Sequence, residues 1–175
     1  MINDDEIYGL YQKNKEQGFR MLMDAYQKSL YFFIRRMVVV HADAEDVMQE
    51  VFLRVFRNLS SFRRDCSLKT WIYKIATNEC VRFLHHQNES EVPLEAGLTS
   101  ELLTTEYVDY ENELAVNFQK AILTLPEKQR VVFNLRYYDE LEYAEISRIT
   151  NIKVENLKVD YHYAKEKIKK YMMNE

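Results

Sequence analysis

Apolar residues recur every three or four positions along most of the chain, with polar residues between them. This spacing gathers the apolar side chains on one face of an α-helix, so it predicts amphipathic helices rather than strands. The sequence has only three Gly and two Pro. Because these residues commonly form the turns between strands, their scarcity also favours helices. Helices are predicted over residues 7–15, 16–39, 41–59 and 67–86, and again over 111–125, 126–140, 142–150 and 151–170.

Local signals place several helix ends. Asp43 is the predicted N-cap of the third helix, and Asp46 stands three residues later, near the capping-box position. Pro126 is expected in the first turn of the helix that it opens. Ser147 is small where two helices must approach, and Asn151 can adopt the left-handed conformation of a tight turn. The last two helices therefore form a predicted helix-turn-helix.

One segment interrupts the helical pattern. Residues 88–117 contain eight Asp and Glu but no Lys or Arg, and they include Pro93, Gly97 and a Ser/Thr-rich run. Such a composition is typical of a linker. The predicted fold is therefore all-α, with two small helical domains, residues 1–87 and 118–175, joined by an acidic linker.

The net charge of −4 is an average over segments of opposite character. Residues 7–87 carry 13 Lys and Arg against 8 Asp and Glu, a net charge of +5, and residues 118–175 carry 11 against 9, a net charge of +2. Association with nucleic acid depends on local charge more than on totals, so the acidic total does not exclude it.

Several classes of function find no support in the sequence. No apolar run approaches the roughly 20 residues that a membrane span needs, and the acidic N-terminus lacks the apolar core of a signal peptide, so we expect a cytoplasmic protein without membrane insertion. The two Cys lack metal-site spacing, and the four His lack an acidic or Cys partner at ligand spacing. There is no Gly-rich phosphate loop or nucleophile elbow. We therefore expect no enzyme activity, no cofactor and no metal.

Two stretches together resemble the extracytoplasmic-function (ECF) sigma factors, the small promoter-recognition subunits of bacterial RNA polymerase. The first is "DAEDVMQEVFLRVF" followed by "LKTWIYKIATN", and the second is "AILTLPEKQRVVFNLRYYDELEYAEISRITNI". They occur in the family's order and are separated by a linker, as in the family. The resemblance implies a region 2 domain for polymerase docking and the minus-ten promoter element, and a region 4 domain for the minus-thirty-five element.

One polar helix face is a candidate docking surface for RNA polymerase. Its members are spaced so that they lie opposite the apolar stripe of the third helix, and an exposed Leu among polar groups suits helix-to-helix docking. The alternative is that the acids only stabilise a helix N-terminus. The face consists of Asp46, Gln49, Glu50, Leu53 and Arg57.

The loop after the third helix and the fourth helix are the candidate minus-ten surface. An aromatic side chain beside cations can hold a base pulled from the stack together with its phosphates, and Asn can pair with a base edge. Purely structural roles for Phe62, Trp71 and Asn78 remain open. Thr77, His85 and His86 replace arginines that are usual in the family, so the phosphate grip should be weaker. The candidates are Phe62, Arg63, Arg64, Trp71, Lys74, Asn78 and Arg82.

The first turns of the last helix are the candidate minus-thirty-five surface, because base reading in this motif falls there. Asp160 would repel phosphate, and it is expected to point away from DNA. The expected base readers are Lys153, Glu155, Asn156 and Lys158, with His162 and Lys165 near the DNA backbone.

The leading hypothesis is an alternative sigma factor that binds core RNA polymerase and promoter DNA, helps to open the duplex and is a monomer when free. The resemblance also implies an anti-sigma partner. A helix-turn-helix regulator that acts without polymerase is the main alternative, although the polar face around Leu53 is less apolar than a dimer interface should be. The third hypothesis is a helical adaptor protein without a DNA role.

Overall fold

The computed structural model describes residues 3–89 and 113–173, and within these ranges the regular secondary structure is helical, without strands. The N-terminal half holds α1 (Asp4–Lys13), α2 (Lys15–Val38), α3 (His41–Asn58), a short 3₁₀ turn (Leu59–Ser61) and α4 (Leu68–Glu89). The C-terminal half holds α6 (Glu113–Leu123), α7 (Glu127–Tyr137), α8 (Tyr143–Thr150) and α9 (Val154–Met173). The predicted all-α class is confirmed.

Two predicted helix starts differ from the structure. The prediction of Asp43 as the N-cap of α3 is wrong, because Val40 occupies the cap position and its carbonyl oxygen already accepts from the N–H of Ala44 at 2.9 Å. Asp43 lies instead in the first turn, where a carboxylate still stabilises the positive end of the helix. Pro126 is the cap residue directly before α7 rather than a residue of its first turn.

The predicted linker, residues 88–117, falls largely outside the described residues. Its first positions belong to α4, which continues to Glu89, and its last positions belong to α6, which begins at Glu113. The helical signal therefore extends into the acidic segment from both sides.

The two halves share a hydrophobic core. Leu22, Phe33 and Ile72 are fully buried in the N-terminal half, and the same cluster continues into Leu135 and Ile146 of the C-terminal half. A smaller cluster lies between α6, α7 and α9 and consists of Ala121, Ile122, Leu125, Phe133, Ala164 and Ile168. Apolar burial on this scale is the main stabilising contribution, so the packing of the halves belongs to the fold itself.

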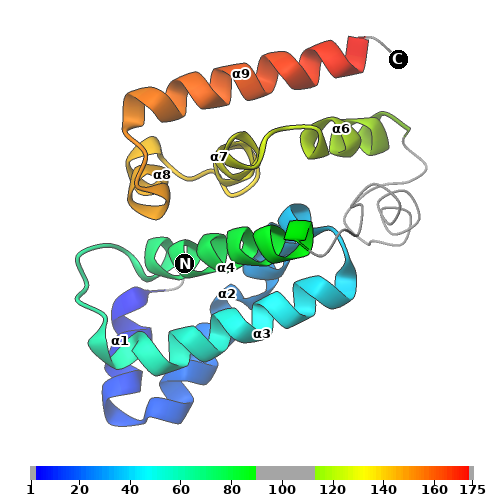
Figure 1. Ribbon diagram of the computed structural model, residues 1–175. Helices are drawn as coiled ribbons and strands as arrows, with labels where there is room; N and C mark the ends of the chain where they lie inside the picture. Colours follow the sequence, from blue (N-terminus) through cyan, green and yellow to red (C-terminus); the bar gives the residue numbers. More distant parts are fainter. Residues whose placement is uncertain (1–2, 90–112, 174–175) are drawn as a thin grey trace.

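Figure 1 shows the helices in layers, with α4 between α1–α3 on one side and α7–α9 on the other. Close backbone approaches join α4 to α2 and α3, and also to α8. α9 lies across the outer side of α6, α7 and α8. The described helices include none that combines the length and apolarity required to cross a bilayer.

The turn between α8 and α9 has the predicted geometry. Asn151 adopts the left-handed conformation with φ 59°, and its N–H donates to the Ser147 carbonyl at 2.9 Å. At the other end of α8, the Glu142 and Glu145 side chains form a reciprocal capping box. These caps fix both ends of a short helix and so define the angle at which α9 leaves the turn.

Substitutions at two glycines, Gly18 and Gly9, can test how closely α1 and α2 are packed. A Cβ atom added at Gly18 would overlap the backbone of Tyr11, whereas one added at Gly9 would meet nothing within 4 Å. We expect Gly18→Ala to lower the free energy of unfolding by roughly 1–3 kcal/mol, as overpacking does. Gly9→Ala is the matched control and should raise it by up to about 1 kcal/mol, because Ala favours the helix. Denaturant unfolding measures both, and equal effects would contradict the close contact.

Candidate docking and nucleic-acid surfaces

The polar face of α3 is formed as predicted. Asp46, Gln49 and Arg57 are exposed, Glu50 is half-buried, and the Leu53 side chain is 47% exposed although it is apolar. The opposite side of α3 is buried in the shared core through Val47, Val51, Phe52 and Val55. The side chains that sequence reasoning assigned to one face therefore reach solvent together.

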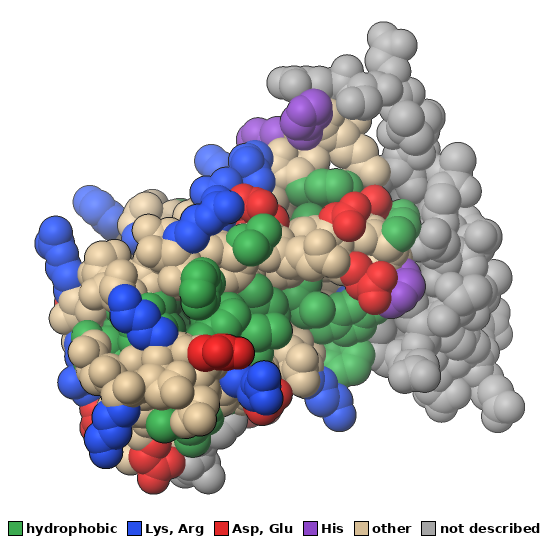
Figure 2. All heavy atoms as spheres, turned by 90° about the horizontal axis from the view of Figure 1, so that it is seen from below, with side chains coloured by type: hydrophobic (Ala, Val, Ile, Leu, Met, Phe, Trp, Pro, Cys, Tyr) green, Lys and Arg blue, Asp and Glu red, His purple; other side chains and the backbone are tan. Residues whose placement is uncertain are grey.

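Phe56 is a neighbour of this face that sequence reasoning missed. Its side chain is 49% exposed, and its ring lies edge-on to that of Phe19, with centroids 5.0 Å apart. Its position three residues after Leu53 places the two on one side of α3. Figure 2 shows the surface on the α1–α3 side, where apolar side chains gather in the middle and charged side chains surround them. An apolar centre with a polar rim is the usual layout of a protein-docking surface.

A charged network connects this face with α4. Glu79 is only 6% exposed, and its carboxylate lies 2.8 Å from Arg54 Nε, which also lies 3.0 Å from Glu50. The Arg82 guanidinium pairs with Glu79 and lies 3.9 Å from Glu50. Arg82 therefore leans toward α3 and the docking face.

A groove of about 500 Å³ runs beside this network. Asp46, Val47 and Glu50 of α3 form one wall, and Arg82, Phe83 and His86 of α4 are among the residues of the other. Both apolar and charged groups line it, which makes the α3–α4 edge a continuation of the α3 face.

The loop residues predicted for the minus-ten surface differ in their burial and in their contacts. Phe62 is buried, and its ring packs on that of Trp71 with centroids 5.0 Å apart. Arg64 adopts φ 59°, pairs with Asp5 and lies over the Tyr8 ring, so it binds the loop to α1. Arg63 is exposed. Arg64 is also exposed, but it is already paired with Asp5.

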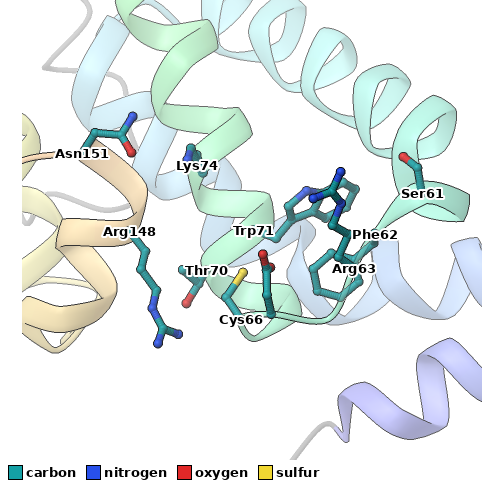
Figure 3. Close-up of a pocket in the computed structure, with 10 residues that line it drawn as sticks. Ser61, Phe62, Arg63, Cys66, Thr70, Trp71, Lys74, Arg148 and Asn151 are labelled. Carbon is teal, nitrogen blue, oxygen red and sulfur yellow. The ribbon is translucent and has the colours of Figure 1, made fainter.

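Trp71 and Lys74 line a cavity of about 620 Å³ that both halves of the chain enclose. Figure 3 shows Phe62, Trp71 and Lys74 on one side, and Arg148 with Asn151 on the other. Sequence reasoning did not select Arg148, because nothing local indicates that α8 faces α4. Asn78, one turn beyond Lys74, is exposed outside this cavity.

The two cysteines, Cys66 and Cys80, are both free thiols. Burial raises the pKa of the Cys66 thiol, and the neighbouring Asp65 raises it further, while Arg148 and Lys74 act in the opposite direction. Burial raises the pKa of Cys80 far more strongly. Neither thiol is therefore an activated nucleophile. In the part of the chain that the structure describes, no His, Cys, Asp and Glu side chains form a group that could hold a metal ion.

All predicted contact residues of the C-terminal half are exposed. Leu157, Ala164 and Ile168 bury one side of α9. Asp160 is half-buried, and the Lys165 ammonium lies 5.1 Å from the centre of the Tyr161 ring. The exposed residues are Lys153, just before the helix, and Glu155, Asn156, Lys158, His162 and Lys165 along it.

Comparison with known families gives two matches in the order of the two halves. Residues 22–89 match the model of Sigma-70 region 2, and residues 115–168 match that of Sigma-70, region 4. The first contains α3, its groove and α4, and the second contains the helix-turn-helix.

Similar proteins and structures extend over nearly the whole chain. The ECF RNA polymerase sigma factor SigW of Bacillus subtilis is 32% identical over 172 residues, which cover 92% of each chain. The ECF RNA polymerase sigma-E factor of Escherichia coli is 30% identical over 178 residues, covering 95% of this chain and 93% of that protein. Among solved structures, the sigma factor RpoE of Bartonella quintana, in complex with the anti-sigma factor NepR, has a TM-score of 0.70 at 19% identity and covers 89% of this chain and 96% of that one. CnrH in complex with the cytosolic domain of CnrY has a TM-score of 0.74 at 14% identity over 98% of both chains. The chain belongs to the family of ECF RNA polymerase sigma factors.

Proposed function

We propose that this protein is an alternative sigma factor that binds core RNA polymerase, directs it to promoters of two elements and helps to open the DNA. The observation that carries the proposal is the exposed Leu53–Phe56 surface of α3 next to α4, a helix that presents Trp71, Lys74 and Asn78. A docking surface beside a base-binding surface lets one protein hold the polymerase where the strands separate.

The docking step rests on the apolar centre of the α3 face. Leu53 and Phe56 can enter a hydrophobic contact with a helix of the polymerase, while Asp46, Gln49 and Arg57 form the polar rim. Contacts at the centre of an interface contribute most of the binding energy, and rim charges contribute mainly to orientation.

DNA opening uses binding energy alone and needs no catalytic group. Trp71 offers a ring for a flipped base, Arg63 and Lys74 offer cations for its phosphates, and Asn78 offers a donor and an acceptor for a base edge. Removing a base from the stack costs a few kcal/mol, and stacking on an aromatic ring returns about 1–3 kcal/mol per base. Phe62 is buried and packs against the Trp71 ring, so it supports that ring rather than receiving a base itself.

Recognition of the minus-thirty-five element falls to the start of α9. Its first turns would enter the major groove, where Glu155 can accept a hydrogen bond from a cytosine amino group and Lys153 or Lys158 can bind guanine or phosphate. His162 and Lys165 lie farther along the helix, toward the DNA backbone.

The acidic total charge is compatible with this function because two weak contacts act together. When both halves are held on one polymerase, the second contact becomes intramolecular and the overall affinity rises without further basic residues. We further propose a cytoplasmic protein that is a monomer when free and is held inactive by an anti-sigma factor. The similar solved structure of RpoE, described as a complex with the anti-sigma factor NepR, supports the expectation of an anti-sigma partner.

Reconstitution tests the proposal. The purified protein, mixed with core polymerase that lacks a sigma subunit, should give transcripts that start at defined promoters and disappear when the factor is omitted. Operator binding without polymerase association would instead support a helix-turn-helix regulator.

The docking surface predicts the effect of one substitution. Leu53→Asp should weaken binding to core polymerase by about tenfold or more, because a charge replaces an apolar side chain at the interface centre. Equilibrium binding measures the loss, with Gln27→Asp on the exposed surface of α2 as the control. Equal affinities for the two variants would remove the α3 face from the interface.

The DNA surface predicts a different loss. Asn78→Ala should reduce promoter opening by about tenfold, the effect of about one to two base-edge hydrogen bonds, and should leave polymerase binding unchanged. Permanganate reactivity of unpaired thymines measures the opening, and polymerase affinity is the control. Opening at the wild-type level would exclude a role for Asn78.

A further inference from the structure

One carboxylate in the first turn of α1 connects three helices. Asp4 Oδ2 accepts a hydrogen bond from the backbone N–H of Leu68, the first residue of α4, at 2.8 Å. Asp4 Oδ1 accepts another from the hydroxyl of Tyr26, a buried residue of α2, at 3.0 Å. Figure 1 shows the beginning of α1 beside the beginning of α4. Asp4 therefore holds the start of α4 from outside that helix and its own loop.

This contact completes the capping of α4. An α-helix begins with backbone N–H groups that have no partner within the helix. Ser67 Oγ accepts from the N–H of Thr70 at 3.0 Å, as an N-cap side chain does. Asp4 takes the N–H of Leu68, which lies 64 residues later in the sequence, and places a negative charge at the positive end of the helix dipole. α4 thus has one capping residue from its own loop and a second from α1.

The next residue of α1 holds the middle of the loop before α4. Asp5 pairs with Arg64, whose guanidinium also lies 4.9 Å from the centre of the Tyr8 ring. Arg64 has a φ of 59°, a left-handed conformation that is strained for a residue with a side chain and persists where surrounding contacts impose it. Because the Asp5–Arg64 pair is exposed, it contributes less than the half-buried contacts of Asp4. α1 therefore holds the loop at two points, of which Asp4 is the stronger.

The Trp71 ring, which the proposed function assigns to a flipped base, lies one helical turn after the Asp4 contact. Trp71 also packs on Phe62 at the other end of the loop, with ring centroids 5.0 Å apart. A recognition site needs its side chains held to within about half an ångström by the residues around them. The match to Sigma-70 region 2 covers residues 22–89 and α1 ends at Lys13, so this support comes from outside the matched region.

We propose that Asp4 is a positioning residue for strand opening: from α1 it fixes the first turn of α4 and thereby holds the Trp71 ring where that ring receives a flipped base. Asp4 acts through Leu68 and does not itself contact DNA. Its role in transcription rests on the proposed function, whereas the placement of Trp71 by Asp4 is a property of the free protein.

The fluorescence of Trp71 tests this placement, because it is the only Trp of the chain. In the free protein, Asp4→Ala should increase acrylamide quenching of that fluorescence and move the emission to longer wavelength, since the released ring meets more water. Circular dichroism should show the helicity of the wild type. Glu6→Ala is the matched control, because it removes an equal charge from an exposed position of the same turn, and it should change neither signal.

A mismatch of donors gives a second test that keeps the size of the side chain. Asp4→Asn leaves one acceptor oxygen for two donors and turns an amide nitrogen toward one of them, so quenching should rise as it does for Asp4→Ala. Adding Tyr26→Phe removes one donor, which lets the remaining oxygen accept from Leu68, and quenching should return toward the wild-type value. Wild-type quenching in a folded Asp4→Ala or Asp4→Asn variant would overturn the positioning role.

Promoter opening by the reconstituted polymerase separates positioning from stability. At a saturating concentration of the factor, Asp4→Ala should lower the permanganate reactivity of minus-ten thymines about fivefold, the effect of one lost capping interaction, with unchanged polymerase affinity. Asp4→Asn combined with Tyr26→Phe should recover opening, and Glu6→Ala should retain it. A purely structural role predicts a lower free energy of unfolding together with wild-type opening, and that result would contradict positioning.

Failure of the positioning role and failure of the proposed function are distinguishable. If the wild type gives no transcripts with core polymerase, the proposed function fails, and the fluorescence of the free protein still decides whether Asp4 places Trp71. If the wild type and Asp4→Ala open promoters equally well, the role of Asp4 fails and the proposed function stands.

Discussion

The packing of α4 between the two halves is the contact on which the rest of the structure depends. The apolar side of α4 completes the core formed with α2 and α3, and its other side receives α8 and the corner at Asp139. The same apolar cluster continues from α4 into Leu135 and Ile146 of the C-terminal half, so α4 joins the two halves into one core.

The acidic residues of this chain have different functions according to where they lie. Glu79 and Asp139 are buried and bind arginines within the protein, so they position α4 rather than repel DNA. The surfaces assigned to DNA keep Arg63, Lys153 and Lys158 exposed. The net charge of the chain does not show this difference between buried acids and exposed cations, because mainly the exposed charges interact with an approaching polyanion.

Features with a local cause could be predicted from the sequence. The 3.6-residue period gave the helices, the face around Leu53 followed from the same period, and the left-handed turn at Asn151 followed from the residue type. Features that depend on distant partners could not. Arg36 and Asp139 are 103 residues apart in the sequence. The pairing of Arg64 with Asp5 and the packing of Phe62 on Trp71 are not indicated by nearby residues either. The same holds for Arg148, which reaches the site only because α8 packs on α4. Each pairing requires the tertiary fold.

The central claim is that the N-terminal half binds the transcription machinery through α3 and thereby places α4 at the DNA. The most direct measurement is the equilibrium association of the purified protein with bacterial core RNA polymerase from which its sigma subunit has been removed. The account predicts a saturable one-to-one complex that the housekeeping sigma subunit displaces in competition. No association at micromolar concentrations, with the protein folded and helical, would contradict it even if α9 bound duplex DNA tightly.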